Sequence, residues 1–191
     1  MNIKSLFSIS CILLATACVA TTDTSSKQDE KSKQLALELY NQGVLAHNKG
    51  DYPKTAELME KSCQSGLVQG CFKLGYLYAK GRGVPQDYQK TYQLYQLSCD
   101  SGYAEACYQV GFMHAEGIGV AKDYTLAASH FEKACNGGYA DGCGYLATMY
   151  GLGDGVKMNQ ATAKKYYGKA CELGHKESCA TYQKMTQMGV K

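Results

Sequence analysis

Residues 99–143 read CDSGYAEACYQVGFMHAEGIGVAKDYTLAASHFEKACNGGYADGC, and this stretch decides the fold. It begins and ends with a pair of cysteines eight positions apart, and the second pair stands 36 residues after the first. The same two columns continue in both directions, so eight cysteines follow one repeat with a period of 36. The first column holds Cys63, Cys99, Cys135 and Cys171, and the second holds Cys71, Cys107, Cys143 and Cys179.

Other columns keep the same step, so the repeat extends through each whole unit. Within one unit, Cys107, Val110 and His114 share one face at helical spacing, and Ala127 and Phe131 share another. Each unit is therefore predicted to be a pair of amphipathic helices. The repeated glycines and valines are Gly66, Gly102, Gly138 and Gly174; Gly81, Gly117 and Gly153; Gly83, Gly119 and Gly155; and Val84, Val120 and Val156.

The ends of these helices are also marked in the sequence. Gly117 and Gly138 are predicted to end the first and second helix of their unit, because glycine tolerates the left-handed conformation that closes a helix. A short polar residue precedes the second helix of each unit and is a candidate N-cap. These caps are Asp51, Asp87, Asp123 and Asn159.

A hairpin of this size cannot bury its apolar face alone, whereas a stack of hairpins can. We therefore expect an all-α solenoid in which residues 175–191 form a final capping helix. Small residues in the first helices are predicted to let the two helices of a hairpin approach closely, with large rings opposite. The small residues are Gly75, Gly111 and Ala147, and the rings are those of Tyr95, Phe131 and Tyr167.

A family resemblance follows from these motifs. The run A/G-C-x-x-L/V-G/A-x-L/M-Y/H, followed by G-x-G-V, D-Y and K-A-C-x-x-G, resembles the SEL-one-like repeat of the tetratricopeptide-repeat superfamily. The two cysteines per unit resemble those of the exported cysteine-rich SEL-one-like proteins of Helicobacter, which are often labelled β-lactamases. The resemblance implies a tetratricopeptide-like unit at 34–66, which has a shorter turn and Leu39 in place of a cysteine. Three SEL-one-like units follow at 67–102, 103–138 and 139–174.

The period itself suggests how the cysteines pair. Cys63 lies at the end of one second helix and Cys71 in the first turns of the next helix, so antiparallel packing brings them together. Four such disulfides would staple each unit to the next, each stabilising by about 2.5 kcal/mol on the chain-entropy estimate. A zinc site is the rival interpretation, but zinc ligands are usually closer in sequence and include nearby histidines. The predicted pairs are Cys63–Cys71, Cys99–Cys107, Cys135–Cys143 and Cys171–Cys179.

The N-terminal residues predict export. Lys4 precedes the apolar run 6–14, which is too short to cross a bilayer but is typical of a signal peptide over 1–17. Cleavage before Cys18 fits ordinary signal peptidase, and it also fits a lipobox that would leave Cys18 lipidated. Residues 18–33 are predicted to be a flexible polar tether. Two locations therefore stay open: a periplasmic outer-membrane lipoprotein, bound to the membrane through Cys18, or a secreted protein.

Composition and motifs argue against several classes of chemistry. The net charge of +3 comes from 20 basic and 17 acidic residues without a basic stripe, which disfavours nucleic-acid binding. No serine has a lysine three positions later, as a serine β-lactamase needs. The four histidines are scattered along the repeats and form no cluster in the sequence, so we expect no metal and no cofactor. They are His47, His114, His130 and His175.

A surface is the better functional candidate. First helices line the concave face of tetratricopeptide-like solenoids, and the register places an aromatic stripe there. These rings either pack between helices or form a groove for an extended peptide or glycan. The positions with which some tetratricopeptide proteins bind C-terminal carboxylates hold aromatic residues here. The candidate binding residues are Tyr40, Phe72, Tyr76, Tyr108, Phe112 and Thr148.

The sequence thus predicts an exported, non-catalytic scaffold for protein–protein interaction, whose partner is an envelope or secreted protein or peptide. A β-lactam-binding or β-lactam-hydrolysing protein is the alternative that the family resemblance implies.

Overall fold

The computed structural model describes residues 10–191, with side chains described from Gln28 onward. This part of the chain forms nine α-helices and no strand, which confirms the predicted all-α solenoid. The helices are α1 (Ser10–Asn48), α2 (Tyr52–Gln64), α3 (Val68–Lys80), α4 (Tyr88–Asp100), α5 (Ala104–Glu116), α6 (Tyr124–Asn136), α7 (Ala140–Leu152), α8 (Gln160–Glu172) and α9 (Lys176–Gln187).

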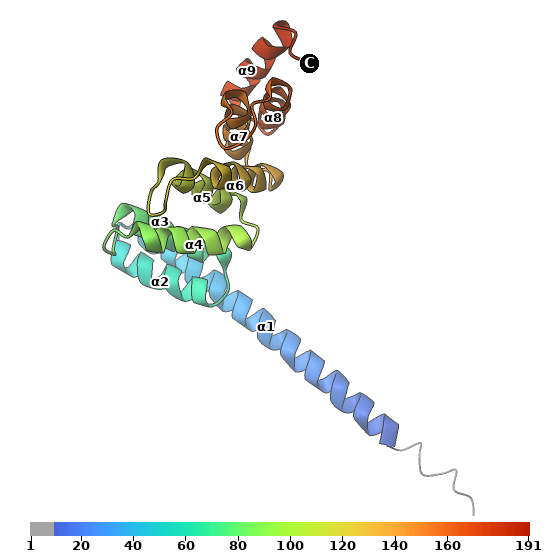
Figure 1. The fold of residues 1–191 in the computed structure, drawn as a ribbon. Coiled ribbons are helices and arrows are strands. Elements are labelled where there is room, and N and C mark those ends of the chain that lie inside the picture. The colour runs from blue at the N-terminus through green and yellow to red at the C-terminus, as the bar shows by residue number, and fades with distance from the viewer. Residues whose placement is uncertain (1–9) are drawn as a thin grey trace, which may run out of the picture.

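The helices form a stack of antiparallel hairpins. Figure 1 shows the pairs α1–α2, α3–α4, α5–α6 and α7–α8 following one another along the long axis, with α9 at the far end. Each helix contacts mainly its neighbours in sequence, and α5 also contacts α7. The first helices of successive repeats therefore lie on a common side of the stack, as expected for a solenoid.

Helix α1 is longer than the sequence predicted. It runs from Ser10 to Asn48, so residues 18–33 lie within a helix where a flexible tether was expected. No glycine or proline stands between Ser10 and Gly43 to interrupt the helix. Residues 1–9 of the predicted signal peptide lie outside the described residues, and so does the side chain of Cys18.

The predicted N-caps are confirmed. Asp87 accepts a hydrogen bond from the backbone N–H of Lys90 at 2.9 Å, and the other three caps bond in the same way three residues onward. Gly117 ends α5 in the left-handed conformation, as predicted. In α6 the C-cap is Gly137, and the left-handed glycine Gly138 is the residue after it.

The core consists of clusters that each hold residues from two neighbouring repeats. Gly75 and Gly111 face the rings of Tyr95 and Phe131, and a Cβ atom at either glycine would lie 2.9 Å from the ring. A larger residue would push the two helices of the hairpin apart, so the predicted close approach is confirmed. Phe131 is 1% exposed and lies at the centre of this packing.

None of the described helices contains a stretch that is both long and apolar enough to cross a membrane.

Candidate binding surface

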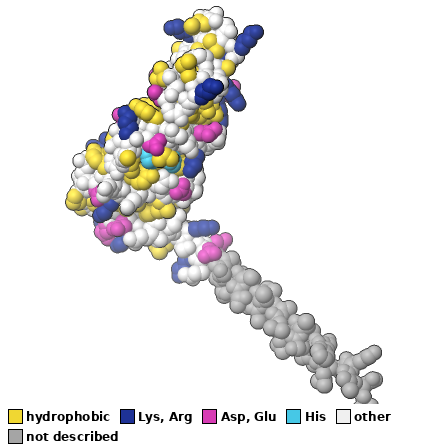
Figure 2. Space-filling view, in the orientation of Figure 1, with side chains coloured by type: hydrophobic (Ala, Val, Ile, Leu, Met, Phe, Trp, Pro, Cys, Tyr) yellow, Lys and Arg dark blue, Asp and Glu magenta, His cyan; other side chains and the backbone are white. Residues whose placement is uncertain are grey.

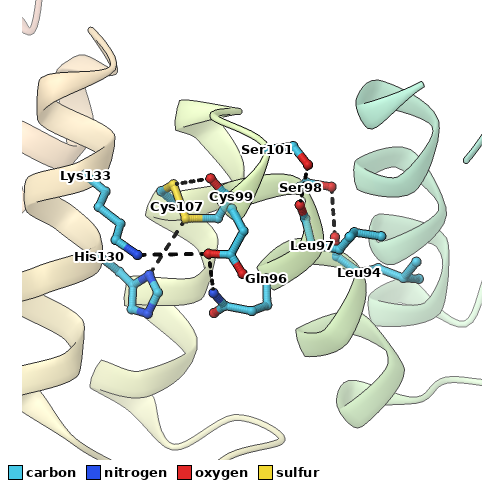
Figure 3. Close-up of a disulfide and its surroundings, with 10 residues drawn as sticks. Leu94, Gln96, Leu97, Ser98, Cys99, Ser101, Cys107, His130 and Lys133 are labelled. Carbon is cyan, nitrogen blue, oxygen red and sulfur yellow. Dashed lines mark hydrogen bonds and ion pairs between the residues drawn. A yellow bond between two sulfur atoms is a disulfide. The ribbon is translucent and has the colours of Figure 1, made fainter. Parts of the chain in front are cut away.

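Four disulfides join each second helix to the following first helix. The Cα atoms of each bonded pair are 4.5 or 4.6 Å apart, and the pairing matches the prediction from the 36-residue period. Figure 3 shows the Cys99–Cys107 disulfide between α4 and α5. The relative position of neighbouring repeats is therefore fixed covalently, which holds the surface made by several repeats in one arrangement.

First helices of neighbouring repeats touch through aromatic side chains. The ring of Tyr108 on α5 lies 5.4 Å from that of Tyr145 on α7 and 5.2 Å from that of Tyr139, the N-cap of α7. Burial is the main cause that raises the pKa of Tyr139 to about 12, so its hydroxyl stays protonated at neutral pH. Aromatic contacts therefore join the first helices α5 and α7 of two neighbouring repeats.

Most of the predicted stripe is accessible. Tyr40, Tyr76, Tyr108 and Phe112 are half-buried, and Thr148 is exposed. Each of these five residues retains surface that a partner could contact.

Phe72 is the exception, and its prediction as a groove residue is wrong. Its side chain is 5% exposed, between the rings of Tyr95 at 5.1 Å and Tyr103 at 5.0 Å. Tyr103 precedes α5 and covers Phe72 from the next repeat. Phe72 therefore belongs to the core between two repeats.

Smaller residues stand at the two ends of the stripe. In the middle repeats, Tyr76 and Phe112 directly follow the glycines that face the second helices. Val44 follows the equivalent glycine of the first repeat, Gly43, which faces Met59. Val44 and Thr148 thus stand where Tyr76 and Phe112 stand in the middle repeats, and a cavity adjoins each of them.

The first cavity, called the α1–α3 hollow, has a volume of about 350 Å³ and lies between α1, α2 and α3. Its apolar wall comes from both helices of the first hairpin and from α3, and its polar rim carries a lysine, a histidine and an asparagine. The lining residues are Val44, His47, Asn48, Thr55, Met59, Lys73, Tyr76 and Leu77.

The second cavity, called the α7–α9 hollow, measures about 260 Å³ and is lined in part by Tyr145, Thr148 and Glu177. The hydroxyls of Thr148 and Tyr167 lie 2.9 Å apart. His175 Nε2 is 3.6 Å from a carboxylate oxygen of Asp141 and 3.7 Å from one of Glu177. This end of the groove therefore carries acidic side chains, whereas no carboxylate lines the α1–α3 hollow.

The structure also brings together two histidines that stand 16 residues apart in the sequence. His114 on α5 and His130 on α6 stack with ring centroids 5.7 Å apart, and both side chains are buried. Their equivalents one repeat later, Tyr150 and Tyr166, stack at the same distance. The 36-residue columns could have revealed this pair, since position 114 corresponds to 150 and position 130 to 166.

Burial makes His130 difficult to protonate. Desolvation, followed by the charges of Lys133 and His114, lowers its pKa from 6.5 to about 4, against a weaker opposing effect of Asp100. Figure 3 shows His130 beside the disulfide, and its Nδ1 lies 3.8 Å from Cys99 Sγ. Protonation would place a charge within the junction of two repeats.

We predict that this histidine makes the fold sensitive to acid. Because the pKa is lower in the folded state, the unfolded chain takes up the proton first as pH falls below about 6.5, and stability falls until about pH 4. The contribution of His130 to this loss is at most about 3 kcal/mol. His130→Tyr, which copies Tyr166, should reduce the difference between urea unfolding curves at neutral pH and near pH 4.5. His47→Gln is the control, and an unchanged difference in His130→Tyr would contradict the prediction.

Charges on the remaining surface are mixed. Figure 2 shows basic and acidic side chains interspersed over the visible face, without a large area of one sign. Among the described side chains, no three of His, Cys, Asp and Glu form a group that could hold a metal ion.

The family follows from the repeat itself. A family model described as the Sel1 repeat matches residues 33–67, 68–103, 104–139 and 140–175. The chain belongs to the Sel1 repeat family. The match includes 33–67, so the unit whose shorter turn suggests a tetratricopeptide-like repeat is also a Sel1 repeat. Among curated proteins, none matches the sequence.

Solved Sel1 repeat structures have the same fold. A protective antigen of uropathogenic Escherichia coli with an SLR fold is 24% identical, with a TM-score of 0.78 over 81% of this chain and 34% of its own. A Sel1 repeat protein from Oxalobacter formigenes is also 24% identical, with a TM-score of 0.74 over 81% and 64%. This Sel1 chain therefore spans less than two thirds of the length of either protein.

A cysteine-rich relative is also similar in structure. Helicobacter pylori cysteine rich protein B is 29% identical to this Sel1 chain, with a TM-score of 0.57. The match covers 69% of this chain and 94% of the Helicobacter protein. This finding agrees with the resemblance that the cysteine columns indicated.

Proposed function

We propose that this Sel1 repeat protein is a non-catalytic scaffold that binds a peptide segment of another envelope or secreted protein. The binding site is the groove along the first helices α1, α3, α5, α7 and α9. The observation that carries the proposal is the row of accessible aromatic side chains on the first helices, with a hollow near each end of the row. Extended peptides dock on such surfaces by placing alternate side chains in successive pockets.

Tyrosine suits this role. Tyr76 and Tyr108 combine a large apolar ring with a hydroxyl, and they lose little conformational entropy when a partner covers them. Tyr108 is already held in place by the rings of Phe131, Tyr139 and Tyr145, so it needs no rearrangement before binding. Pre-organised aromatic residues are the usual hot spots of protein interfaces.

The disulfides are the reason to propose export and therefore an extracytoplasmic partner. Disulfides persist in oxidising compartments, and eight cysteines of this chain form four disulfides. We propose that the N-terminal segment directs export and that Cys18 carries a lipid anchor, with α1 linking the anchor to the repeats. In that arrangement the groove lies in the periplasm, near the outer membrane.

The double variant Tyr76→Ala, Tyr108→Ala tests the groove. It should lose at least about 2 kcal/mol of binding free energy for the main partner that wild-type protein captures from its native envelope. Tyr88→Ala, Tyr124→Ala is the matched control, because these tyrosines are 42% and 40% exposed and begin second helices. Melting temperatures are measured in parallel to exclude unfolding. Full affinity in a folded double variant would refute the groove as the binding site.

The alternative β-lactam activity is tested separately. The non-catalytic proposal expects no hydrolysis of a chromogenic β-lactam above the buffer rate by the purified, fully disulfide-bonded chain. Turnover that persists through repeated purification would contradict it.

A further inference from the structure

The four disulfides differ in how well the rest of the chain covers them. Cys135 and Cys143 are both 0% exposed and pack against Ala170 on α8, the second helix of the next repeat. Cys99 and Cys107 are 4% and 3% exposed, and side chains of α6 cover them in the same way (Figure 3). The second helix of the following repeat thus shields these sulfur atoms from solvent.

The disulfide between α8 and α9 lacks such a cover. Cys171 and Cys179 are both partly exposed, and theirs is the one pair of the four in which neither cysteine is buried. Helix α9 carries Gln183 where α5 carries Gly111. A single Cβ atom at Gly111 would already lie 2.9 Å from the facing ring of Phe131. A glutamine at this position therefore keeps a further helix from packing on α9 as α6 packs on α5.

Helix α9 also has few other attachments. It buries Ser178 and Met185, whereas α3, α5 and α7 each bury six residues. Lys164 on α8 donates a hydrogen bond to the carbonyl oxygen of Val190 and lies over the ring of Tyr182. Segments with few buried side chains open most readily. The disulfide is therefore the main restraint on the position of this helix.

We propose that Cys171–Cys179 is a thiol–disulfide exchange site, at which a small thiol such as glutathione cleaves the bond and releases α9. The inference goes beyond the proposed function, because it concerns the chemistry of one junction and requires no partner protein. It has a consequence for the groove, since α9 supplies Glu177 and Thr181 to the lining of the α7–α9 hollow. Release of the helix would remove one wall of that hollow.

The helix ends indicate which sulfur atom is attacked. Cys179 lies in the first turns of α9, where the positive end of the helix stabilises a thiolate. Cys171 lies in the last turn of α8, at the negative end and next to Glu172. Cys179 is therefore the better leaving group, because exchange is faster when the departing thiolate is stabilised.

The exchange proceeds in two steps. The thiolate of the small thiol attacks Sγ of Cys171, and a new S–S bond forms between them. The bond to Cys179 breaks, and its electron pair leaves on Sγ of Cys179, which takes up a proton from water. A second thiolate then attacks the sulfur atom of the bound small thiol, so that Cys171 leaves as a thiolate and is protonated. Two small thiols are oxidised to one disulfide, and the protein disulfide is reduced.

Mass spectrometry of the folded, fully oxidised protein measures this reaction. Samples are taken during incubation with reduced glutathione, and free thiols are trapped with N-ethylmaleimide. The Cys171–Cys179 pair should be reduced at least about 10-fold faster than Cys135–Cys143, whose sulfur atoms become accessible after local unfolding. The transient glutathione adduct should lie on Cys171. Equal rates for the four pairs, faster reduction of another pair, or an adduct mainly on Cys179 would overturn the inference.

Hydrogen exchange reports the release of α9. In Cys171→Ser, Cys179→Ser, backbone amides of α9 should exchange at least about 10-fold faster than in the wild type, while those of α5 stay unchanged. Cys63→Ser, Cys71→Ser is the matched control, because it removes a disulfide between α2 and α3 and should leave exchange in α9 unchanged. Glutathione-reduced wild-type protein should match the first variant. Full protection of α9 after loss of Cys171–Cys179 would show that the disulfide does not hold the helix.

Both measurements are made without a partner protein. A negative result would therefore remove the exchange site and leave the groove proposal standing. Full affinity of Tyr76→Ala, Tyr108→Ala for its envelope partner would refute the groove and leave the exchange site standing.

Discussion

We expect Phe72→Ala to lower the free energy of unfolding by about 3–5 kcal/mol, with all four disulfides intact. Phe72 is 5% exposed and lies between the rings of Tyr95 and Tyr103, so truncation leaves a cavity between two repeats. The disulfide between Cys99 and Cys107 holds those repeats together, which limits how far the cavity can collapse. Urea unfolding under oxidising conditions measures the loss.

Phe112→Ala is the matched comparison, because Phe112 stands on the next first helix but is only half-buried. Its truncation should cost less than about 2 kcal/mol, in proportion to the smaller apolar area that it removes from water. Equal losses in the two variants would contradict the assignment of Phe72 to the core and of Phe112 to the groove.

The second large effect is expected for Gly155→Ala. This glycine has φ of +68°, and a Cβ atom there would lie 2.2 Å from the carbonyl group of Tyr124 in the preceding repeat. Alanine would have to adopt the left-handed conformation, which costs about 1–2 kcal/mol, and would also push the loop away from α6, for a total of about 3 kcal/mol or more.

Gly138→Ala separates these two contributions. Gly138 has φ of +84°, but nothing lies within 4 Å of the position that a Cβ atom would take, so alanine there should cost the conformational penalty alone. Thermal unfolding of both variants gives the comparison. A Gly155→Ala variant no less stable than Gly138→Ala would show that the loop does not pack tightly on the preceding repeat.

Much of the fold could be predicted because its contacts are local. The period of 36 placed Cys135 at the end of one helix and Cys143 at the start of the next, and the turn between them permits a single close pairing. The N-caps and the glycine facing Phe131 follow equally from neighbouring residues. In a solenoid each unit contacts only its neighbours, so local patterns determine most of the structure.

The groove was predicted less completely because it depends on contacts between units. Phe72 and Tyr108 occupy the same column, yet one is buried and the other is half-buried. Periodicity alone cannot distinguish them. Rings from the next repeat cover both residues, Tyr103 over Phe72 and Tyr139 over Tyr108, so the wider packing of each repeat sets the difference.

The sequence by itself determined the repeat, the helical hairpins, their caps and the four disulfides, because each depends on residues close together in the chain. The tertiary structure decided which aromatic residues are accessible, that His114 stacks on His130, and that Asn48 and Lys73 share one hollow. These features depend on the angle at which α1, α3 and the later first helices pack. That angle is set by the combined shapes of many side chains, such as Val44 beside Met59, and no single column of the repeat encodes it.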